Sequence, residues 1–144
     1  METVEAIINK HGGIKALKDH AITIENAPYM KLCIEYIGQG PRSLPMVSVC
    51  HYGEQNGDLM RDPDMCFEVG TYAGPTQKLN GAWYPISYRN DYMNINQAAC
   101  FTDEFGKVQI RPRLVKQLTT FSNKWDRNIK QQGFLNVAVK VTAT

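Results

Sequence analysis

Carboxylate side chains are concentrated in one short polar segment between two apolar runs of the chain. Its acids are Glu54, Asp58, Asp62 and Asp64. Oxygen ligands of this kind suit Ca²⁺ or Mg²⁺, and Asn56 could add an amide oxygen. A calcium-binding loop, however, needs acids at alternating positions, then a glycine, then a closing glutamate. Because the spacing here does not follow that pattern, we expect turns at 56–57 and 62–64 and no metal ion.

His51 and Glu54 offer a second chemistry, since an imidazole and a carboxylate together can carry out acid–base catalysis. His51 alternates with Val47 and Val49, however, and a histidine on such a strand face is more often a hydrogen-bonded core residue. No serine lies in a glycine elbow, and no glycine-rich phosphate loop precedes a helix. The sequence therefore favours a protein that is not an enzyme, with a hydrolase that has a carboxylate or metal site at Glu54–Asp64 as an alternative.

A second polar cluster, Arg89-Asn90-Asp91-Tyr92, follows another apolar run. Neighbouring carboxylates repel one another, so we expect Arg89 to pair with an acid of the first segment. The two clusters together predict a recognition surface, in which aromatic residues act as anchors or belong to the core. The candidate anchors are Tyr52, Trp83, Tyr88 and Tyr92. The expected binding surface consists of Tyr52, Glu54, Gln55, Asn56, Asp58, Asp62, Arg89, Asn90, Asp91 and Tyr92.

Basic residues recur on one side of a long amphipathic segment near the C-terminus. They are Arg113, Lys116, Lys124 and Arg127. Such a face could follow the phosphates of a nucleic acid, which makes nucleic-acid binding a second alternative. Any solvated helix carries similar residues, and the formal net charge of +2 is too small to argue for a nucleic-acid partner.

The elements that must position these residues begin with two short helices in residues 1–20. Val4, Ile7 and Ile8 recur at helical spacing, with Thr3 suited to the N-cap and Gly12 or Gly13 to the end of the helix. Helices this short are marginal alone, so we expect this N-terminal helical hairpin to dock on a larger body.

From residue 21 to residue 111 the apolar period changes to the alternation typical of strands. Strands are expected at 22–24, 32–37, 46–52, 65–69 and 83–89, with a hairpin that joins 99–102 to 107–111. Short connections favour antiparallel pairing. Residues 70–82 and 90–96 are expected to be loops, the first of them mobile. Pro85 indicates that one side of its strand is unpaired or bulged.

The strongest helix prediction covers residues 112–133, where Pro112 suits the first turn and Gly133 the end. Its apolar stripe consists of Leu114, Leu118, Phe121, Trp125 and Ile129. The tail, 134–144, either adds an edge strand or frays. The predicted fold is α+β: an antiparallel sheet of about five or six strands, an N-terminal helical hairpin and one long C-terminal amphipathic helix packed on the sheet. Residues 1–144 form a single domain.

Composition agrees with one globular domain, since 43% of the 144 residues are apolar and 21% are charged. The cysteines are Cys33, Cys50, Cys66 and Cys100. They form no closely spaced pair, so we expect free buried thiols in a reducing cytoplasm and neither a zinc site nor a disulfide framework. No apolar run is long enough for a membrane span, and the N-terminus lacks the features of a secretory signal.

Two motifs connect the chain to a known family: HYGEQNGDLMRDPDM at 51–65 and YRNDY at 88–92. With the run RPRLVKQLTTFSNKWDRNIKQQGFL at 111–135, they resemble an uncharacterised bacterial domain family associated with plasmids and integrative conjugative elements. The resemblance implies a cytoplasmic protein carried by a mobile genetic element. It assigns no activity, cofactor or catalytic residue. We therefore expect a non-enzymatic accessory module that binds a protein partner and has no cofactor.

Overall fold

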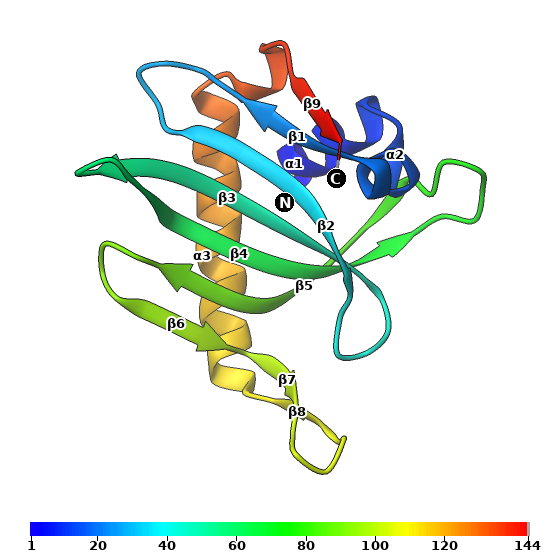
Figure 1. Ribbon diagram of the computed structural model, residues 1–144. Helices are drawn as coiled ribbons and strands as arrows, with labels where there is room; N and C mark the ends of the chain where they lie inside the picture. Colours follow the sequence, from blue (N-terminus) through cyan, green and yellow to red (C-terminus); the bar gives the residue numbers. More distant parts are fainter. Residues whose placement is uncertain (144) are drawn as a thin grey trace.

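The computed structural model describes residues 1–143, in which one antiparallel sheet is the largest element. The strands of the sheet are β1 (His20–Ile24), β2 (Lys31–Gln39), β3 (Pro45–Gln55), β4 (Asp58–Thr71), β5 (Leu79–Asn90), β6 (Ile95–Ala98) and β9 (Lys140–Ala143). They lie in the order β6-β5-β4-β3-β2-β1-β9. Strands β7 (Cys100–Thr102) and β8 (Val108–Ile110) form a separate hairpin. Helix α3 (Pro112–Gln131) runs behind the sheet in Figure 1.

The α+β class, the antiparallel sheet and the long C-terminal helix are confirmed. The described sheet has seven strands where about five or six were expected, because both edges gain a short strand. On one edge, β6 occupies part of the segment expected to be a loop. On the other edge, β9 pairs with β1, so the tail adds a strand. Strands as short as these carry too little periodic signal to be recognised from the sequence.

The polar segment of the sequence lies in one long β3–β4 hairpin. Asn56 and Gly57 have φ angles of 53° and 85°, and Gln55 pairs with Asp58 across them. Two successive residues with positive φ are typical of the tight turns that match the twist of a hairpin. The second turn expected at 62–64 is wrong, because these residues continue β4. The ladder is irregular only where His51 of β3 faces them.

Residues 70–82 are not the mobile loop that was expected. Strand β4 continues to Thr71, and β5 begins at Leu79. The carbonyls of Thr76 and Gln77, between the two strands, accept the backbone N–H groups of Lys15 (3.2 Å) and Ile14 (3.1 Å). These two N–H groups belong to the first turn of α2 (Gly13–Asp19), where helical N–H groups have no partner within the helix. The connection is therefore fastened to the N-terminal region.

Helix α1 (Glu2–Lys10) is capped by a residue from the other end of the chain. The Asp126 carboxylate accepts the backbone N–H groups of Thr3 (3.0 and 3.2 Å) and Val4 (3.2 Å). Thr3 lies inside the helix, so the expected N-cap at Thr3 is wrong. A buried carboxylate at this position satisfies the free N–H groups and also interacts favourably with the helix dipole.

The hydrophobic core lies between the sheet and the helices. From α3 it receives Leu118, Trp125 and Ile129, which are buried, while Leu114 and Phe121 pack against its border. Pro85 lies beside a register shift of the β4–β5 ladder and outside the part of β5 that pairs with β6, as expected. Within residues 1–143, no helix is long and apolar enough to cross a membrane.

Candidate functional site

Three connections meet at one end of the sheet, on the left in Figure 1. They are the β1–β2 loop (25–30), the tip of the β3–β4 hairpin (53–60) and the β5–β6 loop (91–94). We call this region the hairpin end. The two polar clusters of the sequence meet here, although more than twenty residues separate them along the chain.

Arg61 and Asp91 join the two clusters. The Asp91 Oδ2 atom accepts the backbone N–H of Arg61 at 2.8 Å and its side-chain Nε–H at 3.0 Å. In return, the Asp91 N–H donates to the Arg61 carbonyl at 2.9 Å. The backbone N–H and the guanidinium of Arg61 together hold the pKa of Asp91 below its usual range. This arrangement ties the β5–β6 loop to β4.

The expected pairing of Arg89 with an acid of the 54–64 segment is wrong. Arg89 lies directly across the ladder from Asp64, but its Nε atom donates to Asp91 Oδ1 at 3.2 Å. Asp64 instead accepts the hydroxyl of Ser48 at 2.6 Å. An ion pair does join the two clusters, but its partners are exchanged. The arginine, Arg61, belongs to the acidic segment, and the carboxylate, Asp91, belongs to the second cluster.

Asn90 strengthens the same connection from the inside. It is only 4% exposed, and its side-chain N–H group donates to Asp62 Oδ1 at 2.7 Å. The Oδ1 atom of the same side-chain amide accepts the backbone N–H of Met93 at 3.0 Å. Most polar groups of the YRNDY motif are thus occupied in holding a turn, which is the structural role expected for them.

The acids of the hairpin do not converge on one point. Asp62 is held by Asn90 and Asp64 by Ser48, while Glu54 and Asp58 are exposed near the turn. Across residues 1–143, no group of three or more His, Cys, Asp or Glu side chains could hold a metal ion. The arrangement gives no support to a hydrolase that would use these carboxylates.

His51 is a core residue at the base of the hairpin. Its Nδ1 atom lies 3.3 Å from the Lys31 carbonyl, and its ring packs against Trp125 and Phe134 at centroid distances of 5.6 and 5.5 Å. Burial lowers the pKa of this imidazole. No hydrogen bond or ion pair joins His51 to Glu54 in the described part of the chain, so the favoured interpretation of His51 as a hydrogen-bonded core residue is confirmed.

Large apolar side chains are left exposed around the hairpin end. Leu59 at the turn is 53% exposed and Met93 in the β5–β6 loop is 66% exposed. The other exposed members are Tyr29, Met30 and Tyr92. Tyr92 donates its hydroxyl to the Glu54 carbonyl at 3.3 Å, so it lies across the hairpin. Gly53 makes this approach feasible, because a Cβ there would lie 2.5 Å from the Tyr92 oxygen and 3.2 Å from the Met30 sulfur.

The aromatic anchors proposed from the sequence divide into two groups. Tyr92 is exposed at the hairpin end, and Tyr52 is half-buried with the Lys31 ammonium 5.8 Å from its ring centroid. Trp83 packs edge-on against Phe67, and Tyr88 packs edge-on against Phe121, so both belong to the core. Of the four candidate anchors, only Tyr52 and Tyr92 therefore lie at the hairpin end, and Asn90 of the predicted binding surface is buried.

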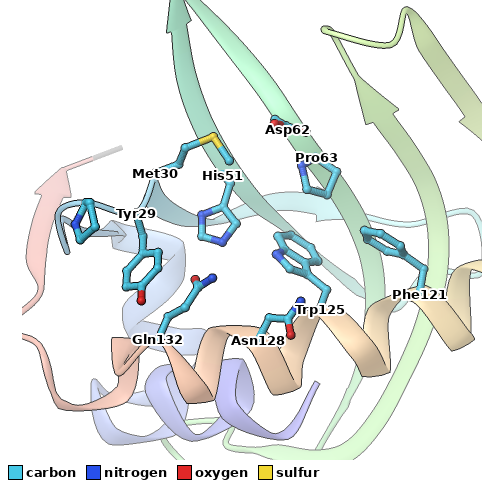
Figure 2. A pocket seen from close by; sticks show the side chains of 10 residues that line it. Tyr29, Met30, His51, Asp62, Pro63, Phe121, Trp125, Asn128 and Gln132 are labelled. Atoms are coloured by element: carbon cyan, nitrogen blue, oxygen red, sulfur yellow. The ribbon is translucent and has the colours of Figure 1, made fainter.

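A cavity of about 450 Å³ lies beneath the hairpin end, between α3 and the inner face of the sheet. Figure 2 shows His51 and Trp125 on its wall with the amides of Asn128 and Gln132 below them. Its remaining lining residues are Pro28, Tyr29, Met30, Asp62, Pro63 and Phe121. A shallower hollow of about 420 Å³ lies on the other side of Tyr29 and Met30, against Tyr52 and Leu59.

Sequence reasoning did not find this cavity. His51 and Trp125 were correctly expected to be core residues, but the cavity around them is formed by the β1–β2 loop, β3, β4 and α3, which the sequence alone does not bring together. One pattern in the sequence does point to the polar side of the cavity. Asn128 and Gln132 follow Phe121 and Trp125 at helical spacing, so these two amides lie on the same face of the helix as the apolar stripe.

The thiols provide no nucleophile. All four cysteines are free, and burial raises their pKa, to about 11 at Cys66. A thiol with a raised pKa is protonated at neutral pH and is a poor nucleophile. The expectation of free thiols is confirmed, with Cys50 and Cys100 buried and the other two half-buried.

The basic residues expected on α3 lie where they were predicted. They are Arg113, Lys116, Lys124 and Arg127, all exposed and without an ion-pair partner in residues 1–143. The only acid of α3, Asp126, is buried against α1. The charged residues on the exposed face of this helix are therefore all basic.

Comparison with known proteins identifies the family of the chain but assigns it no activity, ligand or partner. A family model described as Domain of unknown function (DUF6908) matches residues 2–135, nearly the whole chain. The chain therefore belongs to this family. Neither the curated proteins nor the solved structures contain a match. The association with plasmids and conjugative elements, and the cytoplasmic location, stay predictions.

Proposed function

We propose that this member of the DUF6908 family is a non-enzymatic binding module that recognises a protein partner through the hairpin end. The observation that carries the proposal is a group of large apolar side chains, left exposed on loops that are held in place. Soluble proteins rarely expose contiguous apolar surface unless it contacts something. Exposed aromatic and methionine side chains are also enriched where proteins bind one another.

The loops of the hairpin end are already held in place in the free protein, which lowers the entropy cost of binding a partner. The Arg61–Asp91 and Asn90–Asp62 contacts fix the β5–β6 loop against β4, so Tyr92 and Met93 are presented without a large loss of loop entropy on binding. This explains why so many polar groups in the two motifs are used internally.

Charge indicates what the partner presents. Glu54 and Asp58 are exposed at the rim and have no ion-pair partner among the described residues. A partner segment that combines apolar side chains with lysine or arginine is complementary to this surface. We further propose that the partner is encoded by the same mobile element; the resemblance of the two motifs is the support for this step.

The test is a comparison of surface variants as bait in lysate of the native host, with quantitative mass spectrometry. Leu59→Glu and Met93→Glu place a charge in the proposed contact. Phe105→Glu is the matched control, since Phe105 is 79% exposed in the β7–β8 hairpin, away from the hairpin end. We expect wild type and the control to retain one partner that the first two variants lose by about tenfold or more. Equal recovery by all four proteins would contradict the proposal.

A second candidate function has its own observation in the exposed face of α3. Lys124, Arg127 and Lys130 succeed one another at intervals of three, so like charges are neighbours on the helix surface. Such pairs destabilise a helix by a few tenths of a kcal/mol each, and α3 itself has no exposed acid to relieve them. A polyanion such as DNA or RNA would relieve them.

This alternative predicts binding that weakens steeply as salt rises, because phosphate contacts release counterions. Combined replacement of Arg113, Lys116, Lys124 and Arg127 by glutamate should abolish the binding. Absence of any shift with duplex DNA or single-stranded RNA at low salt would remove this candidate.

A further inference from the structure

We propose that the cavity between α3 and the inner face of the sheet is a binding site for a small, uncharged or singly cationic, planar nitrogen heterocycle. Such a ligand carries a ring acceptor beside a hydrogen-bond donor. The proposal does not rest on the proposed protein partner: Tyr29 and Met30 border both sites, but the polar groups of the cavity, His51 and Trp125, take no part in the partner surface.

Trp125 supplies the first observation. The residue is only 6% exposed, and its indole Nε1–H is the one buried side-chain nitrogen or oxygen that lacks a hydrogen-bond partner within residues 1–143. The other indole, Trp83, donates to Glu5 Oε1 at 3.2 Å. A buried donor without an acceptor is costly, so the Trp125 environment favours a bound group that supplies one.

His51 supplies the complementary group. A carbonyl can only accept, so the His51 Nδ1 atom that faces the Lys31 carbonyl at 3.3 Å carries the ring proton. The second nitrogen, Nε2, is then an acceptor. Figure 2 shows this edge of the imidazole pointing into the open space beside Trp125, toward the amides of Asn128 and Gln132. One donor and one acceptor are therefore presented side by side.

The walls of the cavity select the shape of the ligand. Tyr29, Phe121 and the Trp125 ring give aromatic surface, and Met30 and Pro63 complete an apolar wall. Flat aromatic walls favour planar ligands, which can stack against one ring and meet another edge-on. The volume of about 450 Å³ falls within the usual range for small-molecule sites.

Charge selects against anions. Asp62 is the only acidic side chain on the wall, and no lysine or arginine lines the cavity. The Asp62 Oδ1 atom accepts the side-chain N–H of Asn90 at 2.7 Å. A carboxylate or phosphate ligand would meet a like charge without compensation, whereas a neutral or cationic heterocycle would not.

The experiment follows the indole N–H resonances by ¹H–¹⁵N correlation NMR while the full chain is titrated with adenine. Adenine is neutral at pH 7, planar, and carries a ring nitrogen beside an amino group. We expect the Trp125 resonance to shift in a saturable manner with a Kd of about 1 mM or tighter, as suits a ligand of this size. The Trp83 resonance, already hydrogen-bonded to Glu5, should stay in place and serves as an internal control.

Benzoate provides the matched negative probe, being planar but anionic and without a donor; we expect it to leave the Trp125 resonance unchanged.

His51→Phe keeps a buried aromatic ring and removes the acceptor, so it should weaken adenine binding about tenfold or more. His11→Phe, at a histidine whose Nδ1 also faces a carbonyl but lies outside the cavity, should bind adenine as wild type does. The proposal is overturned if the Trp125 resonance of the wild-type protein does not shift with adenine, or if it shifts equally with benzoate. This outcome does not depend on how any variant folds.

Discussion

Asp91 shows how a single carboxylate can organise this protein. It accepts the backbone and side-chain N–H groups of Arg61 and the side-chain Nε–H of Arg89, so one residue connects the two polar clusters of the sequence. The sequence did not predict that Asp91 would pair with Arg61 and Arg89. The residues were recognised as a polar cluster, but which base meets which acid depends on the direction each side chain takes from its strand.

The lowered pKa of Asp91 predicts how stability depends on pH. The carboxylate is favoured in the folded state, so its contribution is present above the ordinary carboxyl pKa and is lost as pH falls through the lowered, folded-state value. Below about pH 4, the melting temperature of wild type should therefore fall more steeply than that of Asp91→Asn. Asp58→Asn, at an exposed acid without a partner, should retain the wild-type slope. Parallel curves for wild type and Asp91→Asn would contradict this role.

The cap that Asp126 provides for α1 makes a second prediction at this scale. Asp126→Ala leaves the N–H groups of Thr3 and Val4 without an acceptor and should lower the free energy of unfolding by about 1–2 kcal/mol. Lys124→Ala, two residues away on the exposed face of α3, should change it by less than about 0.5 kcal/mol. Urea denaturation of both variants measures the difference. Equal urea midpoints for the two variants would show that Asp126 does not stabilise α1.

At the scale of elements, the sequence predicted those with a strong period and missed those that depend on distant contacts. The apolar stripe of α3 and the alternation of β2 and β3 were sufficient to locate them. The β4–β5 connection had no period, yet its carbonyls cap α2 and its ends extend both strands. The cap of α1 likewise comes from residue 126, and nothing in the first ten residues indicates it.

Helix α3 gives a test of how its buried and exposed faces differ. Trp125→Ala removes a large side chain from between His51 and Phe121 and should cost about 3–5 kcal/mol of stability. Lys124→Ala, its neighbour on the exposed face, again serves as the control. Chemical denaturation that gave the two variants similar midpoints would show that the apolar stripe does not face the core.

At the scale of the whole molecule, antiparallel topology brings three connections to the same end of the sheet. The sequence identified two of them as polar clusters and suggested that they share a surface. It could not reveal that the β1–β2 loop joins them, or that a cavity lies beneath, since both depend on how β1, β3 and α3 pack in space. The exposed apolar residues and the buried, unpartnered indole are therefore visible only in the folded chain.

Site-specific photo-crosslinking in the native host tests the proposed role of the hairpin end most directly. A photoreactive phenylalanine analogue replaces Leu59 in one version of the protein and Phe105 in another, and both are irradiated in living cells. We predict one discrete protein adduct from position 59, with lysine or arginine beside apolar residues at the crosslinked segment of the partner, and none from position 105. Adducts at both positions, or at 105 alone, would contradict a partner site at the hairpin end, as would the absence of any protein adduct from position 59.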